Sequence, residues 1–422
     1  MMHLYVEHEF KPVGQGLFAY GSLTMLHTPK GKRRITFAGQ APEWEFQWVY
    51  DCGSSSGQTL VNRGIQDIAS KLNGKSLDLI VISHLHFDHI SGLLELLKKV
   101  HVKSIMLPWA PLWQRLLIGF EQGLRDGDVE LEFYADPTGY IASVASDRFE
   151  RIFFVLPSDG GDRTDPDEPF PSLDPDGPDL DRREGIKAAP TRLPDKLQVP
   201  DTSENRHFTE VFKSGARLVK GGAWEFVPYN DPKSAPKSPE TFKKTVNELR
   251  PILLGHDDVA REKALKQLKR LYSRGFPAGS QNDLSLSIYT GPVPLSRWTF
   301  DSGKIVGANA TSIPDAPAPI LYTGDGNFST KTHWLRLATF LGNKRTKAIS
   351  TFQVPHHGSR YNWKNGNARL VSPTFSVFSS DPTRRYGHPH AEVLRDFLLF
   401  GSKQVDKHND FKWDTHFSLP KE

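Results

Sequence analysis

The stretch Ser83-His84-Leu85-His86-Phe87-Asp88-His89 decides the fold class and the chemistry of this chain. It continues the run Leu77–Ser83, whose apolar and β-branched residues predict a buried strand. The histidines and the aspartate therefore lie where a strand ends and a loop begins. Imidazole nitrogens and carboxylate oxygens are ligands for zinc, manganese or iron. A loop that is rich in histidine by chance is a poorer explanation, because four ligand-type residues at this spacing are far more specific than one.

The spacing within this stretch assigns its side chains to neighbouring positions around a metal. His84 and His86 are two residues apart, so on an extended backbone they project to the same side and can hold one ion. Asp88 and His89 follow where the chain turns into the helix-like segment Ile90–Lys99. We expect these two residues to point at a second ion beside the first.

Two further motifs follow apolar strands in the second half of the chain. Asp325 lies on a Thr-Gly-Asp turn behind the strand Ile320–Tyr322, and flanking glycines allow the turn to point its carboxylate inward. Two cations held close together need a bridging anionic oxygen, and Asp325 is the candidate. His356 and His357 end the strand Ile349–Val354. Neighbouring residues on an extended chain face opposite ways, so we expect only one of the two to bind a metal.

Together these motifs resemble those of the metallo-β-lactamase fold, with its His-x-His-x-Asp-His signature at residues 84–89. The closing motifs are similar to those of one branch, the soluble domain of the ComEC competence proteins and the phosphorylcholine esterases. The resemblance implies an α/β (α+β) fold, a four-layer αβ/βα sandwich interrupted by a long acidic, proline-rich insertion. Besides the metal loop, the stretches that carry it are Val13–Gly16, Val49–Gly53, Tyr322–Asp325, Val354–Ser359 and Tyr386–His390.

The resemblance also implies the cofactor and its ligands. We expect two divalent metal ions, zinc with manganese as the alternative. The expected metal ligands are His84, His86, Asp88, His89, Asp325 and His357. Many members of the family place another histidine between the first cluster and the aspartate. This chain has no convincing equivalent, so Asn282 or water is expected to take that place.

The resemblance further implies residues that act on the substrate, namely Asp88, His356 and His388 as catalytic groups. His356 is expected to face the substrate phosphate or to anchor a hydrogen bond behind the metal ligands. His388 is expected to act as a general acid, to contact phosphate, or to be a structural loop histidine. Asn282, Ser359 and Arg360 are expected to bind the substrate, the last two by stabilising negative charge.

Length and composition restrict the remaining possibilities. The 422 residues suffice for one large domain with insertions. We expect an N-terminal half over 1–157 and, over 207–422, a C-terminal half with a helical insertion that includes one helical stretch at 239–274. The acidic, proline-rich segment 158–206 is expected to be a mobile insertion that a protein partner can bind. The single cysteine excludes a disulfide framework, and we expect a cytoplasmic protein without a secretory signal or a membrane span.

The function expected from these features is metal-dependent hydrolysis by a metal-activated water. The branch resemblance and the basic residues after His357 favour a phosphodiesterase, specifically a nuclease that cleaves DNA. A net charge of only +4 does not by itself indicate a nucleic-acid binder. Two alternatives stay open: a phosphodiesterase or esterase for small molecules, such as a phosphocholine ester or a cyclic nucleotide, and a catalytically silent metal-binding interaction module.

Overall fold

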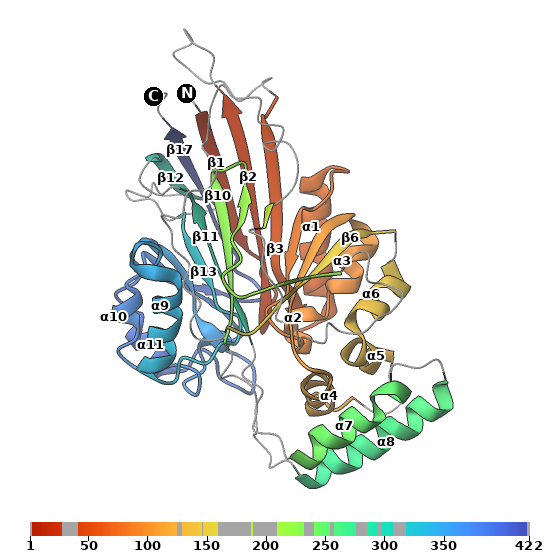
Figure 1. The fold of residues 1–422 in the computed structure, drawn as a ribbon. Helices are drawn as coiled ribbons and strands as arrows, with labels where there is room; N and C mark the ends of the chain where they lie inside the picture. Colours follow the sequence, from red (N-terminus) through yellow and green to blue (C-terminus); the bar gives the residue numbers. More distant parts are fainter. Residues whose placement is uncertain are drawn as a thin grey trace.

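The computed structural model describes residues 2–27, 41–124, 129–145, 147–158, 187–188, 209–231, 240–253, 257–275, 285–293, 298–306 and 318–419. Within these residues the strands form two sheets that lie face to face, with helices on both outer faces (Figure 1). The expected mixed α/β sandwich is confirmed. The insertion 158–206 lies outside the described residues except for Ser158 and one two-residue strand, so its boundaries and its role stay predictions.

The first sheet has nine strands among the described residues and is built from both ends of the chain. Its order is β12-β17-β1-β2-β3-β4-β5-β6-β8. Strands β3 to β8 run parallel, and the strands on the other side pair antiparallel. The bounds are β1 (Met2–Phe10), β2 (Gly16–His27), β3 (Trp44–Ser54), β4 (Leu79–Val81), β5 (Val102–Pro108), β6 (Phe149–Val155), β8 (Thr209–Phe212), β12 (Thr299–Val306) and β17 (Phe411–Leu419).

The second sheet has eight strands among the described residues, in the order β16-β15-β14-β13-β11-β10-β9-β7. Strands β13 to β16 are parallel. The bounds are β7 (Lys187–Ala188), β9 (Leu218–Lys220), β10 (Trp224–Asn230), β11 (Leu286–Pro292), β13 (Ile320–Tyr322), β14 (Thr351–Gln353), β15 (Phe375–Ser379) and β16 (Ser402–Val405).

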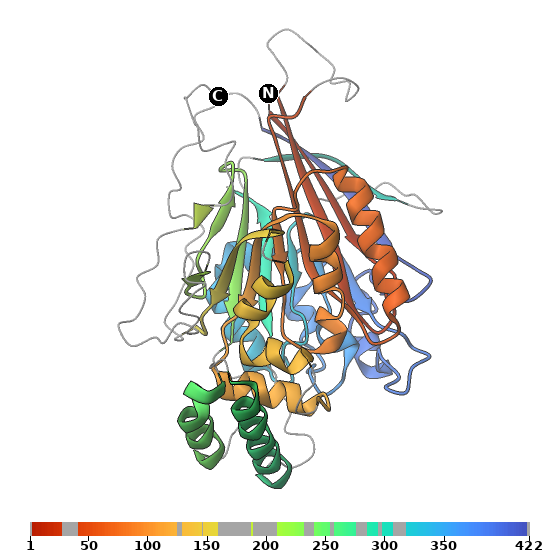
Figure 2. The ribbon, with the colours of Figure 1, turned by 90° about the vertical axis from the view of Figure 1, so that its right-hand side faces the viewer.

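Helices cover the outer face of each sheet, and a further helical group projects from one end (Figures 1 and 2). The helices are α1 (Gln58–Leu72), α2 (Phe87–Ile90), α3 (Leu93–Lys99), α4 (Leu112–Glu121), α5 (Val129–Ala135), α6 (Pro137–Ala145), α7 (Glu240–Leu253), α8 (Asp258–Gly275), α9 (Lys331–Ala348), α10 (Ala368–Val371) and α11 (Ala391–Asp396). Helices α1, α3 and α6 pack on the first sheet, and α9 to α11 pack on the second. None of the described helices combines the length and the apolar character that crossing a bilayer requires.

Large aromatic side chains fill the space between the two sheets. Trp48, Trp224 and Trp413 are buried there, and the ring of His8 lies among them, 4.7 Å from the ring of Trp413. The inward residues of β1 alternate with outward ones, as expected of a strand with one face on a core. This central layer holds the sheets at a fixed separation, so the strand ends of one sheet face those of the other.

Two segments expected to be continuous helices are divided in the structure. The segment Ile90–Lys99 is divided between α2 and α3 at Ser91 and Gly92. Gly92 packs closely on Cys52 and Val61, so that a Cβ there would lie 2.3 Å from the Val61 side chain. The stretch 239–274, expected to be one helical stretch, forms the antiparallel pair α7 and α8. Their apolar faces pack with α4 and α5 in a separate small core.

The burial of His8 generates a prediction about stability. Desolvation lowers the pKa of His8 from 6.5 to about 3, so the folded protein holds this imidazole neutral. The folded state gains the full contribution of neutral His8 to its stability above pH 6.5. This contribution is lost as the pH falls toward 3, because His8 then binds a proton in the unfolded state and not in the folded one. We expect the free energy of unfolding to fall by on the order of 2 kcal/mol between pH 7 and pH 5 from this residue. Urea unfolding of the His8→Phe variant at both pH values should show a smaller decrease.

The exposed His408 supplies the control. A His408→Phe variant should keep the decrease of the wild type. An equal pH dependence in the wild type and in His8→Phe would contradict the assignment.

Candidate metal centre

The histidine loop begins at the carboxyl end of β4 and closes against β3. Ser83 and His84 are buried, and the chain enters α2 at Phe87. A Cβ on Gly53 of β3 would lie 2.5 Å from the backbone of His89. Only glycine at position 53 therefore lets α2 come this close to the sheet.

A carboxylate of the second sheet meets this loop. Asp325 follows β13, and its backbone N–H donates to the Ser285 hydroxyl at 3.0 Å. The backbone N–H groups of Thr323 and Gly324 both donate to the Gln353 side-chain oxygen, which fixes the turn. The Asp325 carboxylate lies 3.1 Å from His89 Nε2 and 3.6 Å from His84 Nε2. The expected inward position of Asp325 agrees with this geometry.

His356 and His357 both approach the same carboxylate. Their Nε2 atoms lie 3.7 and 3.8 Å from Asp325. We expected adjacent residues on extended backbone to face opposite ways, and this premise is wrong because both residues have left-handed backbones, with φ of 47° and 56°. The two differ in burial, since the side chain of His357 is 3% exposed and that of His356 is 25% exposed.

Backbone and carboxylate contacts fix the orientation of His357. Its Nδ1 donates to the carbonyl oxygen of Ser379 at 2.7 Å, and its Nε2 lies 3.2 Å from the Asp88 carboxylate. With Nδ1 occupied, Nε2 is the atom that can face a metal. The assignment of His357 rather than His356 as a metal ligand stays a prediction, and this geometry supports it.

Asp51 on β3 is a candidate functional residue that the motifs alone did not identify. Its buried carboxylate accepts hydrogen bonds from the Ser83 backbone N–H at 2.6 Å, the Ser83 hydroxyl at 2.7 Å and His89 Nδ1 at 2.7 Å. It thus fixes the tautomer of His89 and turns Nε2 toward Asp325. The sequence feature that could have identified Asp51 is an acidic residue in the otherwise apolar strand Val49–Gly53.

The remaining expected residues occupy different environments. His86 packs its ring against His84 with 4.6 Å between centroids. His388 lies beside the pair of histidines, 5.9 Å from the His356 ring, and its Nδ1 accepts from the Gln15 amide at 3.4 Å. The pKa of His388 is lowered to about 3 by burial and by the neighbouring histidines.

Two of the residues expected to bind substrate, Ser359 and Arg360, lie in the described part of the chain, and neither forms a hydrogen bond or an ion pair with the carboxylates of the centre. Ser359 is buried, and its hydroxyl accepts from the backbone N–H of Tyr361. The guanidinium of Arg360 pairs with Glu392 at 3.3 Å at the surface. Asn282 lies outside the described residues.

Among the described residues, His84 Nε2, His89 Nε2 and Asp325 Oδ1 are buried without a hydrogen bond of good geometry, although the last two lie 3.1 Å apart as an ion pair. Such orphaned atoms are costly unless something binds them. Two groups have ligand atoms within 4.8 Å of one another, one of His84, His89 and Asp325 and one of Asp88, His89 and His357. Imidazole and carboxylate donors gathered in this way fit divalent cations. The groups overlap at His89, so metal titration is needed to count the ions.

The electrostatics of the centre also call for positive charge. Burial alone would lower the pKa of His89, but the carboxylates of Asp325, Asp51 and Asp88 outweigh it and raise that pKa well above its ordinary value. Burial would raise the pKa of Asp325, yet His356 and His89 hold it well below its ordinary value. The carboxylates keep buried imidazoles of the centre protonated and therefore positively charged. A bound cation would supply the same positive charge next to these carboxylates.

The comparisons agree with this geometry in one part of the chain. Residues 48–199 match the model of a family described as the metallo-beta-lactamase superfamily. That span includes Asp51 and the histidine loop, while Asp325 and His357 lie beyond it. No curated protein matches.

One similar solved structure is MEM-A1, a subclass B3 metallo-beta-lactamase isolated from a soil metagenome library. It is 12% identical, and the alignment covers 83% of this chain and 81% of that one with a TM-score of 0.23. At that TM-score the likeness carries no argument about fold or function.

The contact between Asp51 and His89 generates a prediction. We expect Asp51→Asn to lower zinc affinity by roughly 10–100-fold, because loss of the carboxylate behind a metal-binding histidine costs that much. Isothermal titration of metal-stripped protein measures it. Asp78→Asn is the matched control, since Asp78 is also a buried carboxylate that accepts a backbone N–H in the same sheet, from Gln47. Unchanged zinc affinity in Asp51→Asn would contradict the role.

Proposed function

Since the protein carries a metallo-beta-lactamase superfamily domain, we propose that it is a zinc-dependent phosphodiesterase that cleaves nucleic acid, with single-stranded DNA as the preferred substrate. The superfamily supports metal-dependent hydrolysis. The phosphodiester substrate rests on the resemblance of the closing motifs to the ComEC and phosphorylcholine esterase branch and on the surface around the centre. The cytoplasmic location stays a prediction from the single cysteine.

The observation that carries the choice of nucleic acid is a set of exposed aromatic rings on the loops that bear the histidines. Phe87 is 55% exposed, Tyr361 is 70% exposed and Tyr386 is 67% exposed. Phe87 belongs to the histidine loop, Tyr361 follows the His356-His357 turn, and Tyr386 stacks on His388 with 5.9 Å between ring centroids. Exposed rings beside a phosphate-cleaving centre suit the stacking of unpaired bases, which contributes about 1–3 kcal/mol per base.

Cations accompany these rings. The guanidinium of Arg360 lies over the ring of Tyr361 at 5.4 Å, and Arg384 and Arg385 are exposed next to Tyr386. Alternating aromatic and cationic side chains suit a single strand, which offers base faces and a phosphate backbone together.

The donor set suits zinc, since it combines several imidazoles with carboxylates. When bound, a zinc pair supplies a water of lowered pKa and neutralises charge on the phosphoryl group. Asp325 lies between the histidines of both sheets and is the residue proposed to bridge two ions. The ligand set, with His84, His86, Asp88, His89 and His357, stays as expected from the motifs.

The residues at the opening of the centre are proposed to position the phosphate. His388 accepts from Gln15 at Nδ1, and the Gln15 side-chain oxygen in turn accepts from the Asp381 backbone N–H at 3.3 Å. The proton of a neutral His388 then lies on Nε2, which can donate to a phosphoryl oxygen. His356, more exposed than His357, is the histidine of the pair that a substrate can reach.

The test is cleavage of single-stranded DNA, of supercoiled plasmid and of bis-p-nitrophenyl phosphate by the full chain with zinc or manganese. We expect cleavage of all three substrates, fastest on single strands, and at least a 100-fold loss in Asp325→Asn. Tyr361→Ala and Tyr386→Ala should each raise KM for single strands by roughly 5–150-fold, the equivalent of one lost stacking contact. Neither should change KM for the small diester.

Leu399→Ala, which removes an 83% exposed apolar side chain from another part of the surface, is the control and should behave as wild type. Metal-dependent turnover of the small diester with every nucleic acid untouched would replace the proposal by a small-molecule phosphodiesterase. A metal-loaded protein that hydrolyses none of these substrates would overturn the phosphodiesterase assignment itself.

A further inference from the structure

A second group of metal-ligating side chains lies on the first sheet, away from the centre described above. It consists of His3 on β1, His416 on β17 and Asp301 on β12, three neighbouring strands. His3 is close to the N-terminus, at the end of β1 that lies far from α2 and the histidine loop (Figure 1). None of these residues takes part in the proposed function.

The strand register explains why these three side chains meet. Tyr5 lies opposite His416 in the β1–β17 pairing, and His3 lies opposite Ser418, so His3 and His416 are diagonal neighbours on one face. The pairing of β12 with β17 shifts register between Phe300 and Ser302, which leaves Asp301 in a bulge. A bulge re-aims a side chain, and here the Asp301 carboxylate reaches His416.

The distances suit a metal site. His3 Nδ1 lies 3.1 Å from His416 Nε2, the nitrogen with which it would share an ion. Asp301 Oδ2 lies 3.4 Å from the other nitrogen of that ring, Nδ1, so the carboxylate must shift to reach the same ion. Taking one donor atom from each residue, all three lie within 4.8 Å of one another. Zinc bound at about 2.0–2.2 Å to each donor holds tetrahedral ligands roughly 3.3 Å apart. The Asp301 side chain is 31% exposed, so its carboxylate has room for the shift that closes the site.

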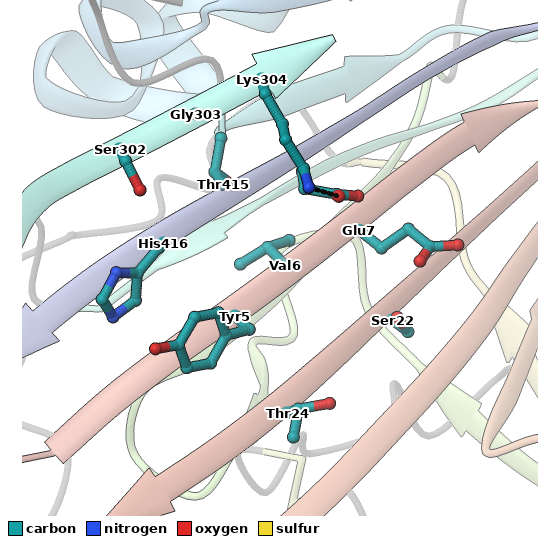
Figure 3. Close-up of a pocket in the computed structure, with 11 residues that line it drawn as sticks. Tyr5, Val6, Glu7, Ser22, Thr24, Ser302, Gly303, Lys304, Thr415 and His416 are labelled. Carbon is teal, nitrogen blue, oxygen red and sulfur yellow. Dashed lines mark ion pairs between the residues drawn. The ribbon is translucent and has the colours of Figure 1, made fainter. Parts of the chain in front are cut away.

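A groove of about 590 Å³ borders the cluster (Figure 3). It crosses β12, β17, β1 and β2, and the ring of Tyr5 stacks on His416 with 4.2 Å between centroids. The polar side chains of Ser302, Lys304 and Thr24 are among those that line the groove. A zinc ion with three protein ligands needs a water or an anion in the fourth position, and the groove provides space for either.

We propose that His3, His416 and Asp301 form a second zinc site, separate from the hydrolytic centre, that clamps β12 to β17 and β1. The site takes one Zn²⁺ through two imidazoles and one carboxylate. The competing interpretation of the same contacts is a metal-free chain of hydrogen bonds. In that chain His416 Nδ1 donates to the Asp301 carboxylate, and His416 Nε2 forms a second hydrogen bond with His3 Nδ1.

The experiment counts zinc bound by the full chain after removal of metal with a chelator. Equilibrium dialysis against Zn²⁺, with zinc measured by mass spectrometry, compares the wild type with His416→Phe, which keeps a ring to stack on Tyr5. We expect His416→Phe to bind one equivalent less. Asp301→Asn should lower the zinc affinity of this site by at least about 10-fold. Loss of a residue that only supports a metal ligand already lowers metal affinity by that factor, and Asp301 is proposed as a ligand itself. His408→Phe removes an exposed histidine from the turn before β17 and should bind as wild type.

Amide hydrogen exchange distinguishes loss of the zinc site from misfolding of a variant. At a free zinc concentration equal to the wild-type dissociation constant, zinc should slow amide hydrogen exchange of Ser302, Gly303 and Lys304 on β12 in the wild type and in His408→Phe. It should slow that exchange far less in Asp301→Asn, whose substituted side chain is partly exposed. Equal zinc counts in all four proteins, or slowed exchange in Asp301→Asn as in the wild type, would overturn the proposal and leave the hydrogen-bonded chain.

Discussion

The carboxylate of Asp325 is the group on which the rest of the structure depends. It is buried within 3.8 Å of the nitrogens of four histidines, His84, His89, His356 and His357. Burying a carboxylate away from water is tolerated only where opposite charge and hydrogen bonds surround it. The carboxyl ends of β4, β13 and β14 supply those partners, so the two sheets must meet at this edge. A backbone hydrogen bond from Leu286 to Ser83 joins the sheets there at 2.7 Å.

The sequence motifs were sufficient to predict the α/β sandwich and the strands that precede the histidine loop, Asp325 and the histidine pair. They succeed because ligand-type residues directly after apolar strands leave few alternatives. They fail where the decisive contact is tertiary. Asp51 and Gln15 lie within stretches that look structural, and their partners are 38 and 373 residues away along the chain. The left-handed backbones of His356 and His357 likewise depend on packing that no local pattern encodes.

The histidine centre and the cluster of His3, His416 and Asp301 differ in how the chain supports them. At the centre, carboxylates and carbonyls behind the imidazoles fix each ring, as Asp51 does for His89 and Ser379 for His357. At the outer cluster a strand bulge and one aromatic stack supply the positioning, and solvent reaches two of the three side chains. Rigid support behind the ligands suits catalysis, whereas a lightly supported site at a strand edge suits a clamp.

The pairing of β1 with β17 has a consequence for how the protein is made. Met2 pairs with Leu419 and Phe10 with Phe411. The edge of β1 that pairs with β17 therefore stays unpaired until about 400 further residues have been synthesised. At roughly 5–20 residues per second, translation leaves that edge open for about 20–80 s. An unpaired strand edge recruits other chains. The nascent protein should therefore depend on ribosome-associated chaperones more than its finished fold would suggest.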